Sequence, residues 1–128
     1  MMHRTRATRL VAALGVAAAL TLGVAGCTSE PAAASIEVTA ETVILDVRTP
    51  AEFASGHLDG AINIDVQAAD FEARVSELDP NADYVVYCRS GNRSAAAIDR
   101  MADLGFTSLV DGGGVDQAAA ATGLDVVS

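Results

Sequence analysis

The sequence has no lysine and no tryptophan, and it has only two cysteines and two histidines. So few sulfur and imidazole ligands exclude a cysteine-rich zinc site, and we expect neither a metal ion nor a bound cofactor. All eight basic residues are arginines, and 17 residues are acidic. An acidic surface repels the phosphate backbone, so we also expect no nucleic-acid partner.

The first 26 residues have the composition of an export signal rather than of a folded element. A basic start with Arg4, Arg6 and Arg9 precedes an uncharged and almost wholly apolar stretch over 10–25. That stretch has about the length of a signal-peptide apolar region and is shorter than the roughly 20 residues of a membrane-spanning helix. The following Val24-Ala25-Gly26-Cys27 resembles a bacterial lipoprotein cleavage box, in which the cysteine receives the lipid. An ordinary secretory signal, with Cys27 incidental, is the alternative.

These features divide the chain into a lipoprotein signal peptide over 1–26, a palmitate-type lipid on Cys27 with a flexible tether over 27–35, and a folded domain over 36–128. Cleavage after residue 26 of 128 would leave 102 residues, which suffice for one hydrophobic core. Five arginines and 17 acidic residues would remain, for a net charge near −12. Because that charge excludes a polybasic membrane contact, we expect the exported protein to attach to the outer face of the bacterial cell membrane only through the lipid.

Strand-like and helix-like segments alternate along the domain. Strands are predicted where β-branched and apolar residues gather, at 36–38, 42–47, 61–64, 84–87 and 108–110. Helices are predicted from Thr49-Pro50 to Gly56, and over 67–78, 94–104 and 115–122. The alternation predicts an α/β fold, a three-layer α/β/α sandwich around a central, mostly parallel sheet of about five strands.

The segment most typical of a catalytic loop is Cys88-Arg89-Ser90-Gly91-Asn92-Arg93, which lies between a predicted strand and a predicted helix. Ligands of parallel sheets bind beyond the carboxyl ends of the strands, where this segment lies. Gly91 permits a positive φ, so the loop can turn successive N–H groups inward around an anion. The start of the following helix, together with Arg89 and Arg93, adds positive charge at the same point.

This environment predicts a lowered pKa for the Cys88 thiol, as for other cysteines at helix starts beside cationic groups. An ionised thiolate is a nucleophile that needs no general base. The alternative is a buried and inert cysteine, but two arginines and a glycine within five residues do not suit an apolar site.

Several short motifs in this order resemble the rhodanese family over residues 36–123. They are Leu45-Asp46-Val47-Arg48, Glu52-Phe53, Gly56-His57-Leu58, Gly60-Ala61-Ile62-Asn63, the segment from Cys88 to Arg93, and Gly112-Gly113. The resemblance implies a single-domain sulfurtransferase with the rhodanese-like fold. The family often has a tryptophan shortly after its glycine pair, and this chain has none.

The resemblance also implies a mechanism and a set of site residues. Cys88 takes a sulfane sulfur from a donor such as thiosulfate, holds it as a covalent persulfide, and passes it to cyanide, a small thiol or a protein cysteine. The implied substrate-binding residues are Arg89, Ser90, Gly91, Asn92, Arg93 and Ser94, whose N–H groups hold the persulfide while the two arginines hold the donor's oxyanion.

Three matched residues are expected to support the site rather than to react. Asp46 is expected to brace the catalytic loop, and Arg48 to pair with Glu52. His57 is expected to be a hydrogen-bonded structural residue.

Two other functions remain open. The protein could be a persulfide carrier or redox partner with little small-molecule turnover, or a phosphatase- or arsenate-reductase-like enzyme. Related phosphatases on this fold use an active loop one residue longer than the six residues from Cys88 to Arg93, and this difference favours sulfur transfer.

Overall fold

The computed structural model describes residues 34–128, in which strands and helices alternate. The strands are β1 (Val43–Asp46), β2 (His57–Leu58), β3 (Ile62–Asn63), β4 (Asp83–Cys88), β5 (Ser108–Gly114) and β6 (Val126–Val127). The helices are α1 (Pro50–Ser55), α2 (Phe71–Val75), α3 (Asn92–Asp103) and α4 (Val115–Thr122). The predicted signal peptide and Cys27 lie outside the described residues. Within 34–128, no helix is long and apolar enough to cross a membrane.

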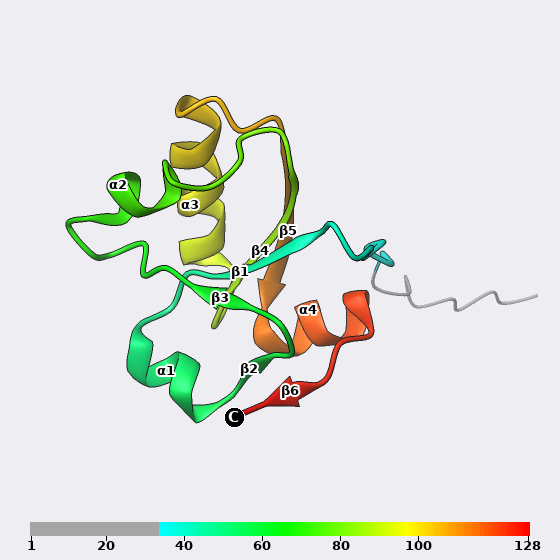
Figure 1. Ribbon diagram of the computed structural model, residues 1–128. Helices are drawn as coiled ribbons and strands as arrows, with labels where there is room; N and C mark the ends of the chain where they lie inside the picture. Colours follow the sequence, from blue (N-terminus) through cyan, green and yellow to red (C-terminus); the bar gives the residue numbers. More distant parts are fainter. Residues whose placement is uncertain (1–33) are drawn as a thin grey trace, which may run out of the picture.

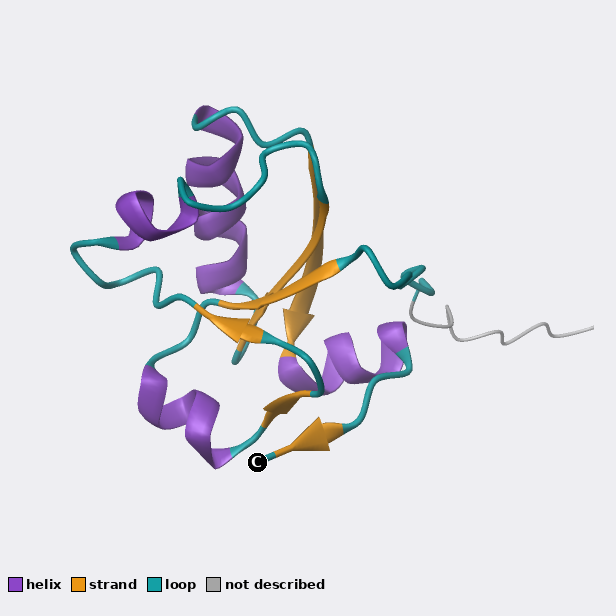
Figure 2. Ribbon diagram, in the orientation of Figure 1, coloured by secondary structure: helices purple, strands orange, loops and turns teal. Residues whose placement is uncertain are grey.

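Four parallel strands form the central sheet in the order β3-β1-β4-β5 (Figure 2). Helices α2 and α3 lie on one side of it, and α1 and α4 lie on the other (Figure 1). The predicted α/β/α sandwich is therefore confirmed. The sheet has four strands rather than about five, because the predicted strand at 36–38 does not form. Strands β2 and β6 pair antiparallel in a separate ribbon.

The two faces of the sheet pack into two separate hydrophobic cores. Along β4, Tyr84, Val86 and Cys88 belong to the core that also contains residues of α2 and α3. Val85 and Tyr87 point the other way, into the core that contains residues of α4. This alternation follows from the two-residue period of a strand, and it places the Cys88 side chain on the α3 side of the sheet.

The predicted strand at 36–38 is wrong. Ile36 and Val38 are half-buried beside the core on the α4 side, but the segment pairs with no strand among residues 34–128. A backbone hydrogen bond instead joins the Ile36 N–H to the carbonyl of Ala121, at 2.8 Å. The alternating pattern thus reflects packing beside a helix rather than pairing in a sheet.

The predicted bounds of the helices agree with the structure for α1 and α4 but not for α2. Helix α1 begins as predicted, with Pro50 in its first turn and the Thr49 hydroxyl accepting the Glu52 N–H at 3.2 Å. Helix α4 has the predicted bounds. The helix predicted over 67–78 is only the five residues of α2. At its predicted start, the Asp65 carboxylate accepts the Gln67 N–H and forms a turn instead.

Strand β5 contains a β-bulge next to the loop that follows β4. Val86 pairs with Asp111 and Tyr87 pairs with Gly113, so Gly112 is an extra residue. A Cβ on Gly112 would lie 3.1 Å from the Cβ of Ala118, and glycine therefore lets α4 approach the sheet closely. The bulge brings Asp111 and the glycines after it beside the loop that follows β4.

Candidate active site

Cys88 is the last residue of β4, and its side chain is fully buried at the start of the loop to α3. Gly91 adopts a left-handed conformation with φ +96°, as predicted, and immediately precedes the 12-residue helix α3. This turn directs the Gly91 N–H at the Cys88 sulfur, with 2.9 Å between N and Sγ. The positive end of the helix dipole lies at the same place, so the loop favours negative charge on the sulfur.

The pKa of the Cys88 thiol is below its ordinary value. Burial by itself raises this pKa, because it penalises the thiolate, but hydrogen bonds outweigh it. These come from the N–H and hydroxyl of Ser94 and from the N–H groups of Ser90 and Gly91. The direction agrees with the sequence-based prediction, and its cause is mainly backbone amides rather than the arginine side chains.

Arg93 pairs with a carboxylate of helix α1. Its guanidinium makes two parallel hydrogen bonds to the Glu52 carboxylate, at 2.9 and 2.8 Å, and so ties the start of α3 to α1. The predicted pair between Arg48 and Glu52 is therefore wrong. Arg93 lies closer to Glu52 because α1 and the start of α3 meet at the same end of the sheet.

Arg48 pairs with Asp46 instead, and both are buried. The Arg48 guanidinium donates to the Asp46 carboxylate at 2.6 Å and to the Gly56 carbonyl at 2.6 Å, and the Arg48 N–H also donates to Asp46. Asp46 makes no hydrogen bond with the Cys88–Arg93 loop among the described residues. It holds Arg48 in place rather than bracing the loop directly, which corrects the sequence-based expectation.

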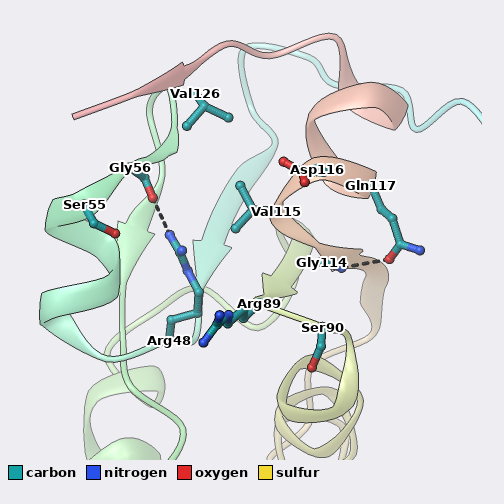
Figure 3. A pocket seen from close by; sticks show the side chains of 10 residues that line it. All are labelled: Arg48, Ser55, Gly56, Arg89, Ser90, Gly114, Val115, Asp116, Gln117 and Val126. Atoms are coloured by element: carbon teal, nitrogen blue, oxygen red, sulfur yellow. Dashed lines mark hydrogen bonds between the residues drawn. The ribbon is translucent and has the colours of Figure 1, made fainter.

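Arg89 is exposed and lines a pocket of about 550 Å³ (Figure 3). The pocket lies between the loop, α4 and the β2–β6 ribbon, and Arg48 lies at its wall. Its lining residues are Arg48, Ser55, Gly56, Arg89, Ser90, Gly114, Val115, Asp116, Gln117 and Val126. Arg89 is thus the loop arginine that the structure leaves available to an anion, while Asn92 is exposed on the first turn of α3.

Glycines of β5 pack directly behind the loop. A Cβ on Gly114 would lie 2.6 Å from the carbonyl oxygen of Arg89, so no larger residue fits without moving the loop. The Gly114 N–H is satisfied by the side chain of Gln117, at 2.9 Å (Figure 3). Gly114, which follows the matched Gly112-Gly113 motif, therefore permits the close approach of β5 to the active loop.

One residue of the site was missed in the sequence. The Asp111 carboxylate accepts hydrogen bonds from the Ser94 hydroxyl and from the Gly113 N–H, both at 2.8 Å. An aspartate that precedes a glycine run is a common turn signal, and it could have indicated this position. His57, by contrast, is the structural residue expected, with Nδ1 2.8 Å from the Phe53 carbonyl and its ring stacked on Phe53.

Glu52→Gln is expected to lower the free energy of unfolding by about 1 kcal/mol at neutral pH, as for a partly exposed ion pair. Hydrogen bonds from Arg93 lower the pKa of Glu52 from 4.5 to about 2. The carboxylate therefore stabilises the fold above its unfolded pKa, and this contribution is lost as the pH falls from 4.5 toward 2. Urea unfolding of both proteins at neutral pH and at two acidic values measures the difference, which should shrink with acidification. A difference independent of pH would contradict the pair's role.

Comparisons with known proteins agree with this geometry. The rhodanese-like domain family matches residues 31–119. The chain is 31% identical over 85 residues to the thiosulfate sulfurtransferase PspE of Escherichia coli, a match that covers 66% of this chain and 82% of that protein. It is 32% identical over 100 residues to a sulfurtransferase of Allochromatium vinosum, with 78% and 92% covered.

Among solved structures, a rhodanese-related protein from Thermoplasma volcanium superposes with a TM-score of 0.57 at 34% identity, over 68% of this chain and 84% of that one. A rhodanese from E. coli, solved with anions, gives a TM-score of 0.57 at 26% identity, over 68% and 98%. The family match spans most of the chain and includes the whole loop after β4. The chain therefore belongs to the rhodanese-like domain family.

Proposed function

We propose that this protein is a sulfurtransferase that carries a sulfane sulfur on Cys88. The observation that carries the proposal is the Gly91 N–H at 2.9 Å from the Cys88 sulfur, in a loop whose hydrogen bonds lower the thiol's pKa. A persulfide is an anion whose outer sulfur needs the same donors. The thiosulfate sulfurtransferase and sulfurtransferase names of the relatives support this reaction class.

In the first half-reaction, the Cys88 thiolate attacks the outer sulfur of a donor such as thiosulfate. A sulfur–sulfur bond forms at Cys88, and the sulfur–sulfur bond of thiosulfate breaks, with its electron pair leaving on sulfite. The enzyme then holds a Cys88 persulfide. No general base is invoked, because the lowered pKa of Cys88 favours its thiolate, which is the nucleophile.

In the second half-reaction, a nucleophilic acceptor attacks the outer sulfur of the persulfide. Cyanide would leave as thiocyanate, and a thiol would leave as a persulfide, while Cys88 returns as the thiolate. We expect the acceptor to approach from the pocket beside the loop, which Arg89 and Ser90 line. A small molecule fits in about 550 Å³, and a protein cysteine would have to reach the buried sulfur on an extended segment.

We assign the donor's oxyanion to Arg89 rather than to Arg93. Both were candidates in the sequence, but Arg93 already makes two hydrogen bonds to Glu52. Arg89 lines the pocket, with the exposed Ser90 beside it. Arg93 then fixes the start of α3, and with it the position of Ser94 and the loop amides.

The test is the reaction of the full-length chain with thiosulfate and cyanide, read out as sulfite and thiocyanate. Without acceptor, one added sulfur should appear by mass spectrometry on the tryptic peptide 75–89, which contains Cys88 and not Cys27. Persulfide formation with negligible turnover would identify a carrier protein instead. Cys88-dependent hydrolysis of an aryl phosphate without any persulfide would replace the proposal by a phosphatase.

We also propose that the protein is exported and anchored to the outer face of the cell membrane by a lipid on Cys27. The basic start, the apolar stretch over 10–25 and the small residues before Cys27 support it. Protein recovered from bacterial membranes is expected to lack residues 1–26 and to carry acyl mass on Cys27. A soluble product with an unmodified Cys27 would contradict the anchor and leave the proposed reaction untouched.

A further inference from the structure

The hydroxyl of Ser94 has three polar neighbours and only one hydrogen. Its oxygen lies 2.8 Å from the Asp111 carboxylate, 2.9 Å from the Gly91 carbonyl and 3.6 Å from the Cys88 sulfur. Ser94 is fully buried, so water does not supply a further partner. A hydroxyl donates one hydrogen bond at a time, and the three neighbours therefore compete for it.

The Asp111 carboxylate is the strongest of the competitors in the resting protein. Hydrogen bonds to an ionised acceptor are about twice as strong as bonds between neutral groups. The Gly91 carbonyl already accepts the Ala95 N–H, at 3.2 Å. While its hydrogen is on Asp111, the Ser94 oxygen can only accept a hydrogen bond from a protonated Cys88, and the donation by which this hydroxyl lowers the pKa of Cys88 is withheld.

A thiolate or a persulfide at Cys88 needs the opposite arrangement. A negative sulfur is stabilised by a Ser94 hydroxyl that donates to it, and is repelled by an oxygen lone pair. The backbone N–H groups around Cys88 stabilise the anion in either case, but donation by the Ser94 hydroxyl requires its hydrogen to leave Asp111, which keeps the Gly113 N–H as a partner. We propose that Asp111 is a positioning residue that withholds the Ser94 hydrogen from Cys88 and thereby limits how readily this sulfur becomes an anion.

The pairing of β5 with β4 and the turn after Asp111 hold its carboxylate in this position. Val86 pairs with Asp111, but the next residue of β4 pairs with Gly113, so the chain turns between them. The carboxylate accepts the Gly113 N–H within that turn, which fixes its orientation toward Ser94. Asp111 is itself exposed, so its charge is screened and its effect on Cys88 has to pass mainly through the hydroxyl.

The other charged groups near Cys88 are held in ion pairs or line the pocket. Two are ion pairs, Arg93 with Glu52 and Arg48 with Asp46. Arg89 and Asp116 line the pocket, from the loop and from α4. Asp116 is thus a carboxylate in the pocket of Arg89 that makes no hydrogen bond with the Ser94 hydroxyl. It provides a matched control for the removal of a carboxylate at Asp111.

The inference rests on the proposed role of Cys88, but its test measures the thiol and needs no sulfur donor. Iodoacetamide alkylation of the full-length chain is followed against pH on peptide 75–89, separately from Cys27. Asp111→Asn, whose amide oxygen can still accept the Gly113 N–H, is expected to lower the apparent pKa of Cys88 by about half a unit to one unit. Asp111→Ser is a second neutral variant, in case the first does not fold.

Asp116→Asn is expected to shift the apparent pKa of Cys88 by much less. In a Ser94→Ala background the effect of Asp111→Asn should largely disappear, because the shared hydrogen is gone. An unchanged or raised pKa in both Asp111 variants overturns the inference. So does an equal shift with and without the Ser94 hydroxyl, which would assign the effect to charge alone.

Discussion

Cys88→Ser is expected to lower thiosulfate:cyanide sulfur transfer by on the order of a thousandfold or more. A serine hydroxyl stays protonated at neutral pH, and it cannot hold a sulfane sulfur as a persulfide. The loop that surrounds the residue should be unaffected, because the replaced atom is small and the Gly91 N–H can donate to oxygen as well as to sulfur. Sulfite release at several thiosulfate concentrations measures the loss.

The matched control for this variant is the same change at the other cysteine. Purified Cys27→Ser should retain sulfur transfer, because the proposed reaction uses only Cys88. Thermal unfolding of both variants separates a loss of chemistry from a loss of fold. Appreciable turnover by a folded Cys88→Ser protein would rule out a persulfide on this residue.

Features that depend on neighbouring residues could be predicted from the sequence. The start of α1 follows from Thr49 and Pro50, whose chemistry is local. The left-handed turn at Gly91 and the position of Cys88 at the end of a strand follow from the strand–loop–helix pattern. These local rules sufficed to identify the candidate nucleophile and the amides around it.

Features that depend on the packing of distant segments could not be predicted. Arg93 and Glu52 are 41 residues apart, and nothing in either segment indicates that they meet rather than Arg48 and Glu52. Asp111 lies 17 residues after Ser94, and the two meet only through the pairing of β5 with β4, where Asp111 stands opposite Val86 just before the bulge. The assignment of Arg89 and Arg93 to different roles therefore had to await the tertiary structure.

The short ribbon of β2 and β6 illustrates the same limit. Each strand has two residues, too few for a periodic pattern. Their pairing joins His57 and Leu58 to Val127 and Val126, near the end of the chain. The ribbon nevertheless forms one wall of the pocket, through Val126. Part of the pocket wall thus comes from a segment without a recognisable motif.

Arg48→Met is expected to destabilise the fold by about 3–5 kcal/mol, the usual effect of leaving one charge of a buried pair without its partner. Asp46 is fully buried, and Arg48 is 5% exposed. The substitution keeps an unbranched apolar stem, so packing beside Tyr87 is largely preserved. What is lost is the guanidinium, which donates to Asp46 and to the Gly56 carbonyl. Urea unfolding at neutral pH measures the change.

The double variant Asp46→Asn with Arg48→Met distinguishes an unpaired charge from a lost contact. An asparagine side chain at position 46 would still offer an oxygen to the N–H of residue 48, which Asp46 accepts at 2.9 Å. Because the charge is removed, the double variant is expected to recover part of the stability lost in Arg48→Met alone. A double variant less stable than the single one would mean that the geometry of the pair matters more than its charge. Since Arg48 also lines the pocket, sulfur transfer by the folded double variant shows whether the guanidinium serves the donor as well as the fold.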